Sequence, residues 1–126
     1  MKKVTCYIVS ILFLVALTLA FDTKKVMAAD DLVKVMPADV KVLVDNDRVR
    51  VLDVTHKPGV KEPMHSHPAY VSVNMSDTKV KVTTPEGKTV EKARKAGEVS
   101  FSEATTHALE TLGTDGSHVI VIELKK

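Results

Sequence analysis

The chain has 126 residues, with 18 lysines and arginines, 16 acidic residues, 44% hydrophobic residues and a single cysteine. This length accommodates one small domain and excludes a multidomain enzyme. The hydrophobic content is too high, and the charge too balanced, for a disordered chain or a cationic nucleic-acid-binding arm.

The first 28 residues have the layout of a secretory signal peptide. Lys2 and Lys3 precede an apolar stretch that runs to about Phe21, and small residues follow at Ala28 and Ala29. We therefore predict cleavage after Ala28, which gives a periplasmic or secreted protein that no longer contacts a membrane.

Two alternatives to this cleavage remain open. Cleavage after Ala20 also satisfies the small-residue spacing. Residues 1–28 could instead be retained as an anchor, since the apolar stretch approaches the length of a membrane helix.

Removal of residues 1–28 changes the charge and the redox chemistry of the chain. It takes away four lysines, one aspartate and the cysteine, which leaves 14 basic and 15 acidic side chains and a net charge of −1. A mature chain without thiols suits an oxidising compartment and has neither disulfides nor thiolate metal ligands. With Tyr70 and Phe101 as its only aromatic residues, it also lacks the stacking surface and the positive charge of a nucleic-acid-binding protein.

Short β-branched runs separated by turn residues dominate from residue 40 to the end, and they predict an all-β domain over residues 40–126. Residues 85–88, Pro-Glu-Gly-Lys, are typical of a hairpin turn. Residues 29–39 form a polar lead-in for which a short helix and an edge strand both stay open. Eight strands are predicted, at residues 41–44, 48–55, 69–75, 79–84, 89–92, 98–101, 107–112 and 119–124. So many short strands in a small domain can close a compact antiparallel barrel around one small ligand or ion.

Three histidines form the most informative pattern. His65 and His67 point to the same face of an extended chain, and Pro68 favours extended geometry at the residue before it. His107, at the start of a later strand, can supply a third imidazole. Neutral imidazole suits zinc, copper, iron and nickel, and three protein ligands with open positions are typical of a catalytic metal site.

Simpler interpretations of the histidines stay open. By spacing alone, His65 and His67 could be two solvated side chains in a loop. His56 and His118 are isolated at strand edges, which favours surface or packing roles for them.

The arrangement of these residues resembles a known family. Gly59, followed after five residues by His65 and then His67, and later by Gly97 and His107, is similar to the two motifs of the cupin superfamily in its small single-domain form. The resemblance extends over nearly all of the mature chain. It implies a small antiparallel β-barrel, or jelly roll, with one metal ion in its mouth.

The chain departs from the family pattern at one ligand. The family's glutamate would fall on Val71 or Ser72, so Glu62, Glu98 and Glu103 are the candidates to replace it. The remaining three-histidine set is like that of the cupin thiol and diketone dioxygenases. It implies a divalent ion (Fe, Mn, Zn, Cu or Ni) that binds a small anionic or chelating molecule.

Three functions agree with this resemblance. The first is a metal-dependent, dioxygenase-like enzyme, in which Tyr70 is a candidate hydrogen-bond donor inside the barrel. The second is a non-catalytic module that binds a metal or a small ligand, and the third is a metal-independent role in stability or interaction. Edge strands favour a homodimer in each case.

Overall fold

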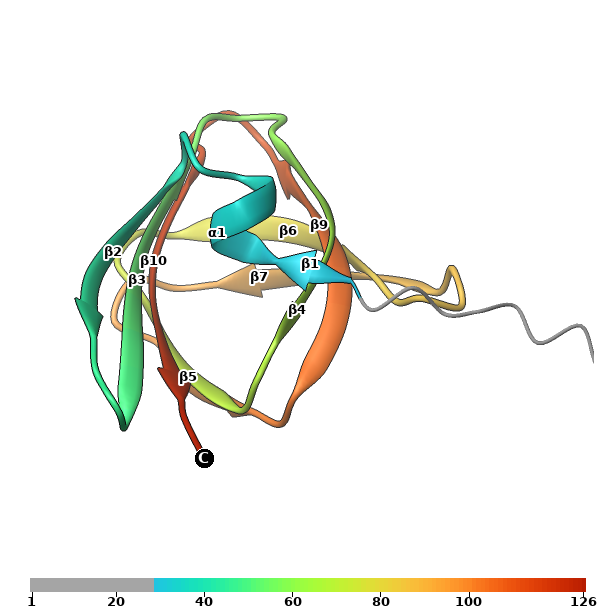
Figure 1. The fold of residues 1–126 in the computed structure, drawn as a ribbon. Coiled ribbons are helices and arrows are strands. Elements are labelled where there is room, and N and C mark those ends of the chain that lie inside the picture. Colours follow the sequence, from blue (N-terminus) through green and yellow to red (C-terminus); the bar gives the residue numbers. More distant parts are fainter. Residues whose placement is uncertain (1–28) are drawn as a thin grey trace, which may run out of the picture.

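The computed structural model describes residues 29–126, which form two five-stranded sheets that face each other (Figure 1). The predicted signal peptide and both of its cleavage sites fall on residues 1–28, outside the described residues. In the described part of the chain, no helix is long and apolar enough to cross a membrane.

All strand pairs are antiparallel except β1 with β4. One short helix, α1 (Leu32–Val35), follows the first strand. The first sheet has the order β1 (Asp30–Asp31), β4 (Lys61–His67), β9 (Thr105–Leu112), β6 (Thr78–Thr83) and β7 (Thr89–Arg94). The second sheet has the order β2 (Val40–Asp45), β3 (Val49–His56), β10 (Ser117–Leu124), β5 (Tyr70–Asn74) and β8 (Val99–Ser102).

This architecture confirms the predicted all-β jelly roll. Each of the eight predicted strands overlaps an observed strand, and the turn after β6 leads into β7 as expected, with the Gly87 N–H donating to the Thr84 carbonyl at 2.9 Å. One long strand, β4, was not predicted, because Lys61–His67 contains a proline and lacks β-branched residues. Pairing with β9 holds β4 extended in spite of this composition.

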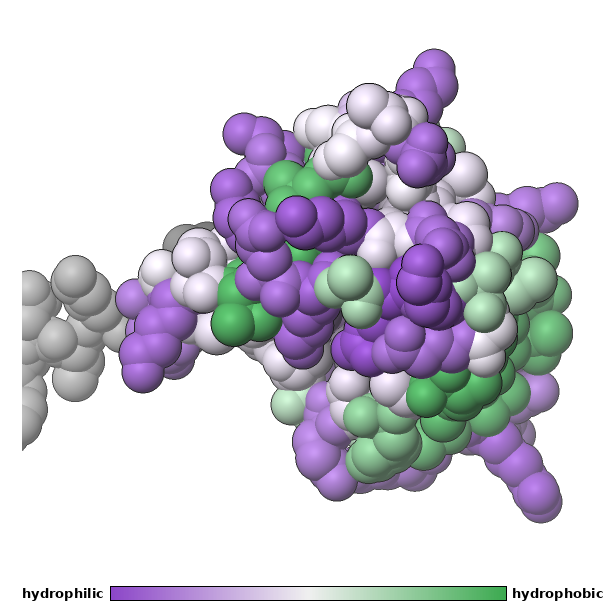
Figure 2. Space-filling model, turned by 180° about the vertical axis from the view of Figure 1, so that it is seen from behind, coloured by the Kyte–Doolittle hydropathy of each residue, from purple (hydrophilic) through white to green (hydrophobic). Residues whose placement is uncertain are grey.

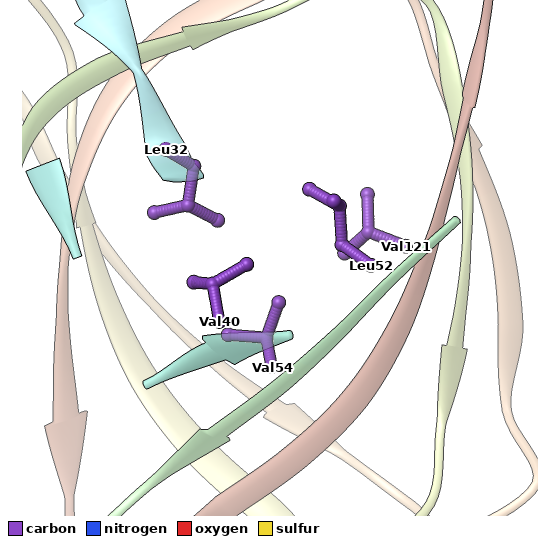
Figure 3. Close-up of a cluster of buried hydrophobic side chains, with 5 residues drawn as sticks. All are labelled: Leu32, Val40, Leu52, Val54 and Val121. Atoms are coloured by element: carbon purple, nitrogen blue, oxygen red, sulfur yellow. The ribbon is translucent and has the colours of Figure 1, made fainter. Parts of the chain in front are cut away.

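The hydrophobic core is aliphatic and rich in valine. Its buried cluster consists of Leu32, Val40, Leu52, Val54 and Val121 (Figure 3). Leu32 comes from α1, which Asp31 caps by accepting a hydrogen bond from the Val33 N–H at 2.9 Å. The lead-in therefore contains both an edge strand and a short helix, and it contributes to the core.

Both edge strands of the second sheet expose hydrophobic side chains. On β8, the exposed fractions of Val99 and Phe101 are 62% and 58%. Val42, Leu43 and Val44 of β2 are also exposed, and Figure 2 shows hydrophobic groups interrupting the charged surface on the far side of the molecule. The homodimer stays a prediction, and these are the edges that it would use.

Gly116 is the glycine whose replacement we expect to cost most. It is buried with φ +74°, and an added Cβ would lie far inside van der Waals contact with the backbone carbonyl oxygen of His56. Gly87, with φ +84°, has nothing within 4 Å of an added Cβ. Both alanine variants lose about 1–2 kcal/mol to the left-handed backbone, and Gly116→Ala loses a further 1–3 kcal/mol to the clash. Thermal unfolding measures the difference, and equal Tm shifts for the two variants would refute the role given to Gly116.

Candidate metal centre

Three imidazoles meet on the inner side of the first sheet. His65 and His67 lie on β4, and His107 lies directly opposite His65 on β9. The ring centroid of His65 lies 4.8 Å from that of His67 and 4.7 Å from that of His107. One nitrogen from each ring lies within 4.8 Å of the other two, and His65 and His67 are buried. The three predicted histidines therefore converge, and the alternative of two solvated side chains in a loop is wrong.

Hydrogen bonds fix which ring nitrogens face the centre. The Pro63 carbonyl can only accept, so the His65 Nδ1–H donates to it at 2.8 Å. The His67 Nδ1–H donates to Glu123 Oε1 at 2.7 Å. When both rings are neutral, both Nε2 atoms carry lone pairs, and they lie 3.0 Å apart. Two nitrogens that bind one ion at about 2.1 Å are about 3 Å apart when their angle is near 90°, so this donor set fits a divalent metal.

Three charged residues form a chain of ion pairs that begins at His67: Glu123, Arg50 and Asp31. Glu123, on β10 and only 1% exposed, accepts a hydrogen bond from Arg50 Nε at 2.6 Å through its other oxygen. Arg50, on β3, also pairs with Asp31 in front of α1. Carboxylates that accept from a metal-binding histidine fix its tautomer and raise its basicity. Sequence reasoning missed this chain, although a glutamate within the apolar run of β10 was a signal that could have found it.

Burial keeps two of the imidazoles neutral. Desolvation lowers the pKa of His65 to about 4. Desolvation, followed by the neighbouring His65 and His67 and then Lys92, lowers the pKa of His107 to about 3. Near pH 7 both rings are in the neutral form that binds metals.

These depressed pKa values predict how the metal-free protein responds to acid. An unfolded histidine takes up a proton near pH 6.5, whereas His107 in the folded protein resists protonation down to about pH 3. The unfolded state thus binds more protons in this window, and the free energy of unfolding falls as the pH falls. Glu62 acts in the opposite sense between about pH 4.5 and 8, because burial raises its pKa to about 8.

The measurement is urea unfolding of metal-free protein between pH 4 and 6. The variant His107→Leu removes one such histidine. It should reduce the slope of the free energy of unfolding against pH by up to about 1.4 kcal/mol per pH unit. Glu62→Gln should steepen the slope. An unchanged slope in His107→Leu would show that this imidazole is not held neutral by the fold.

Only one of the three candidate carboxylates lies at the centre. Glu62 is 6% exposed, and its Oε2 is 3.3 Å from His65 Nε2. Glu98 lies elsewhere and pairs with Arg94 at 2.5 Å. Glu103 is exposed at the outer opening. The structure therefore singles out Glu62 among the residues that could replace the missing glutamate.

The two remaining histidines have different surroundings. His118 Nε2 lies 2.8 Å from Asp53 Oδ1, and both side chains are partly exposed, which agrees with the predicted surface role. His56 is only 4% exposed, and its Nε2 lies 3.3 Å from Glu62 Oε1. Burial also lowers the pKa of His56. His56 is therefore an interior residue beside Glu62, which agrees with the packing alternative.

A cavity of about 150 Å³ adjoins His67 and His107. Its walls include His67, His107 and Tyr70, and the Tyr70 ring lies 5.0 Å from that of His67, so Tyr70 lies inside the barrel. A larger outer cavity of about 600 Å³ shares Tyr70, His107 and Lys92 with the inner one. The inner space holds a few water molecules or one small ligand, which would enter past these shared residues.

Comparison with known proteins identifies the fold. No family model and no curated protein match the chain. A cupin domain from Bordetella pertussis is 28% identical with a TM-score of 0.65, over 69% of this chain and 92% of that one. An RmlC-like cupin with a double-stranded β-helix fold, from Methanocaldococcus jannaschii, is 15% identical with a TM-score of 0.56, over 68% and 78% of the two chains.

An enzyme is also among the similar structures. Oxalate decarboxylase from Bacillus subtilis, for which Mn(II) centres are described, is 12% identical with a TM-score of 0.51. The match covers 64% of this chain and 22% of the enzyme, and at this identity it concerns the fold alone. The jelly roll and these likenesses together establish that the chain has the fold of the small single-domain cupins.

Proposed function

We propose that this cupin binds one divalent metal ion through His65, His67 and His107. The observation that carries the proposal is the pair of Nε2 atoms 3.0 Å apart, with both Nδ1 atoms committed to hydrogen bonds elsewhere. Two unprotonated nitrogens facing each other in a buried site repel one another unless a proton or a metal ion lies between them. His107 completes the set from the opposite strand.

The ligand of this site is a small anion or chelating molecule. Three imidazoles leave the full charge of the ion available to it. Lys92, which lines both cavities, adds positive charge near His107, and no ion pair of Lys92 is found among residues 29–126. The serines at positions 72, 100 and 102 also line the inner cavity and offer hydroxyl groups to an oxyanion.

We further propose that the site performs dioxygenase-like chemistry on this ligand in the periplasm or outside the cell. When bound, the metal supplies Lewis-acid and redox chemistry to a small molecule that coordinates it. The chain supplies the rest: Tyr70 has a hydroxyl for hydrogen bonding, Lys92 orients the anion, and the enclosed cavity excludes bulk water. Export follows from the signal-peptide pattern of residues 1–28.

A non-catalytic binding module is the second candidate. It is favoured by the size of the inner cavity, because about 150 Å³ leaves little space for a second reactant beside the ligand.

Oxygen uptake of the Fe(II)-loaded protein separates the two functions. The panel consists of small thiols, diketones, phenols and dicarboxylates, and Lys92→Met is compared with Lys41→Met, which changes an exposed lysine on β2. Consumption of oxygen that depends on one of these ligands supports the enzyme. Spectral changes without consumption support the binding module, and a Lys92→Met variant that binds anions like Lys41→Met would contradict the role of Lys92.

A further inference from the structure

A group of uncharged polar side chains lines the inner cavity on the side of the second sheet. Strand alternation turns three residues of β5 to the same face, and two serines of β8 lie beside them. All of them line the cavity, and we call this group the polar wall: Tyr70, Ser72, Asn74, Ser100 and Ser102. Because His67 and His107 line the same cavity from the first sheet, the polar wall lies across the cavity from the metal centre.

Asn74 brings an unpaired amide to the polar wall. It is 6% exposed, and its hydrogen bonds within residues 29–126 are those of its backbone, with Glu98 and Gly97. The side-chain amide has two donor hydrogens and an acceptor oxygen. Buried polar groups of this kind are as a rule hydrogen-bonded. Since Asn74 lines the cavity, its amide is available to a molecule bound there.

The hydroxyl groups of the polar wall can accept further hydrogen bonds and donate one. Ser72 Oγ and Ser100 Oγ share a hydrogen bond at 2.8 Å. Each hydroxyl has one donor hydrogen and two acceptor lone pairs, so the pair retains a second donor and several acceptors. Together with the Asn74 amide, these groups offer donors and acceptors without a formal charge. Such a surface matches a hydroxyl group of a ligand, which itself both donates and accepts.

Much of the remaining lining is aliphatic, and it includes the valines at positions 54, 80, 82, 119 and 121. Tyr70 and Phe101 are the only phenylalanine, tyrosine or tryptophan residues outside residues 1–28, and Phe101 is 58% exposed instead of lining the cavity. A bound aromatic ring would therefore find little to stack on. The cavity fits an aliphatic chain whose C–H groups pack on the valines and whose hydroxyl groups face the polar wall.

We propose that the ligand of this site is a short aliphatic polyhydroxy acid, whose carboxylate lies at the metal centre and whose distal hydroxyl group is bound by the Asn74 amide and the pair of Ser72 and Ser100. This inference rests on the proposed function and names the class of its ligand. The charge of Lys92, which lines both cavities, serves the carboxylate, and the uncharged polar wall serves the distal hydroxyl. Asn74 is thereby a specificity-determining residue.

Calorimetric titration of the Zn(II)-loaded protein with glycerate and lactate tests this assignment. Both acids have the same carbon chain, carboxylate and adjacent hydroxyl group, through which they can chelate the ion alike, and glycerate alone has a distal hydroxyl. We expect glycerate to bind at least about 10-fold more tightly than lactate of the same configuration, because lactate leaves the polar wall unpaired.

The Zn(II) content of the protein, measured first, separates the possible failures. If the chain holds one Zn(II) and glycerate binds no more tightly than lactate in either configuration, or if neither acid binds, the inference is overturned and the proposed metal site stands. If the three histidines hold no Zn(II), both are overturned.

Asn74→Leu removes the amide and keeps a side chain of similar shape. We expect this variant to bind glycerate at least about 5-fold more weakly than wild type and to keep its affinity for lactate within about twofold. Thr55→Val, which changes an exposed residue on β3, is the control and should keep the full preference for glycerate.

Ser100→Ala tests the polar wall at a second position, which keeps the test available if Asn74→Leu does not fold. It removes one hydroxyl of the serine pair and should also reduce the preference for glycerate over lactate. A wild-type preference in either folded variant would contradict the polar wall as the site that binds the distal hydroxyl.

Discussion

His107→Ala is expected to bind a divalent metal at least about 100-fold more weakly than the wild-type protein, because it loses the one ligand that comes from outside β4. The remaining pair, His65 and His67, lies on a single strand. Two ligands do not enclose an ion in the way that three or four do. Isothermal titration with Zn(II) measures the loss.

His118→Ala is the matched control for this experiment. It removes an imidazole that pairs with Asp53 at the surface, so its affinity for Zn(II) should equal that of the wild type. If His107→Ala retained wild-type affinity, His107 would be removed from the ligand set, and with it the three-histidine centre.

Glu123→Ala is expected to destabilise the protein by about 3 kcal/mol. Glu123 is 1% exposed and lies between His67 and Arg50, so its removal leaves a largely buried guanidinium with one carboxylate fewer. Breaking a buried ion pair from one side typically costs about 3–5 kcal/mol, and Asp31 retains part of the compensation here. Urea unfolding measures the change.

The control is Glu110→Ala, which removes a glutamate that pairs with Lys81 on a more exposed surface. A surface ion pair of this kind contributes at most about 1 kcal/mol. Equal losses of stability in Glu123→Ala and Glu110→Ala would contradict the structural role of the buried chain.

The effect of Glu123 on the metal can be separated from its effect on folding. A double variant, Arg50→Met with Glu123→Leu, replaces the ion pair by apolar groups and should recover much of the lost stability. It should still bind Zn(II) about 10–100-fold more weakly, since the His67 Nδ1–H no longer donates to a carboxylate. Wild-type affinity in the double variant would mean that Glu123 acts on folding alone.

The strands could be predicted because their local patterns agree with their place in the fold. The run Arg48-Val-Arg-Val at the start of β3 and the hairpin after β6 carry their information within a few residues. β4 could not be predicted in this way. Its sequence, Lys61–His67, contains Pro63 and polar residues, and its pairing with β1 and with β9, both distant in the sequence, makes it a strand.

The same distinction applies to the centre. The period of two residues predicts that His65 and His67 share a face, and this requires no knowledge of the partner strand. The inward turn of Glu62 depends on a bulge that arises from the register with β9. The contact between Arg50 and Glu123 likewise follows from their pairing across β3 and β10, which local sequence does not encode.

Elemental analysis of the native protein, purified from its own organism without added metal, tests the metal centre most directly. A three-histidine site with a buried carboxylate beside it predicts close to one divalent ion per folded chain. A folded, native protein with no stoichiometric metal would contradict this account.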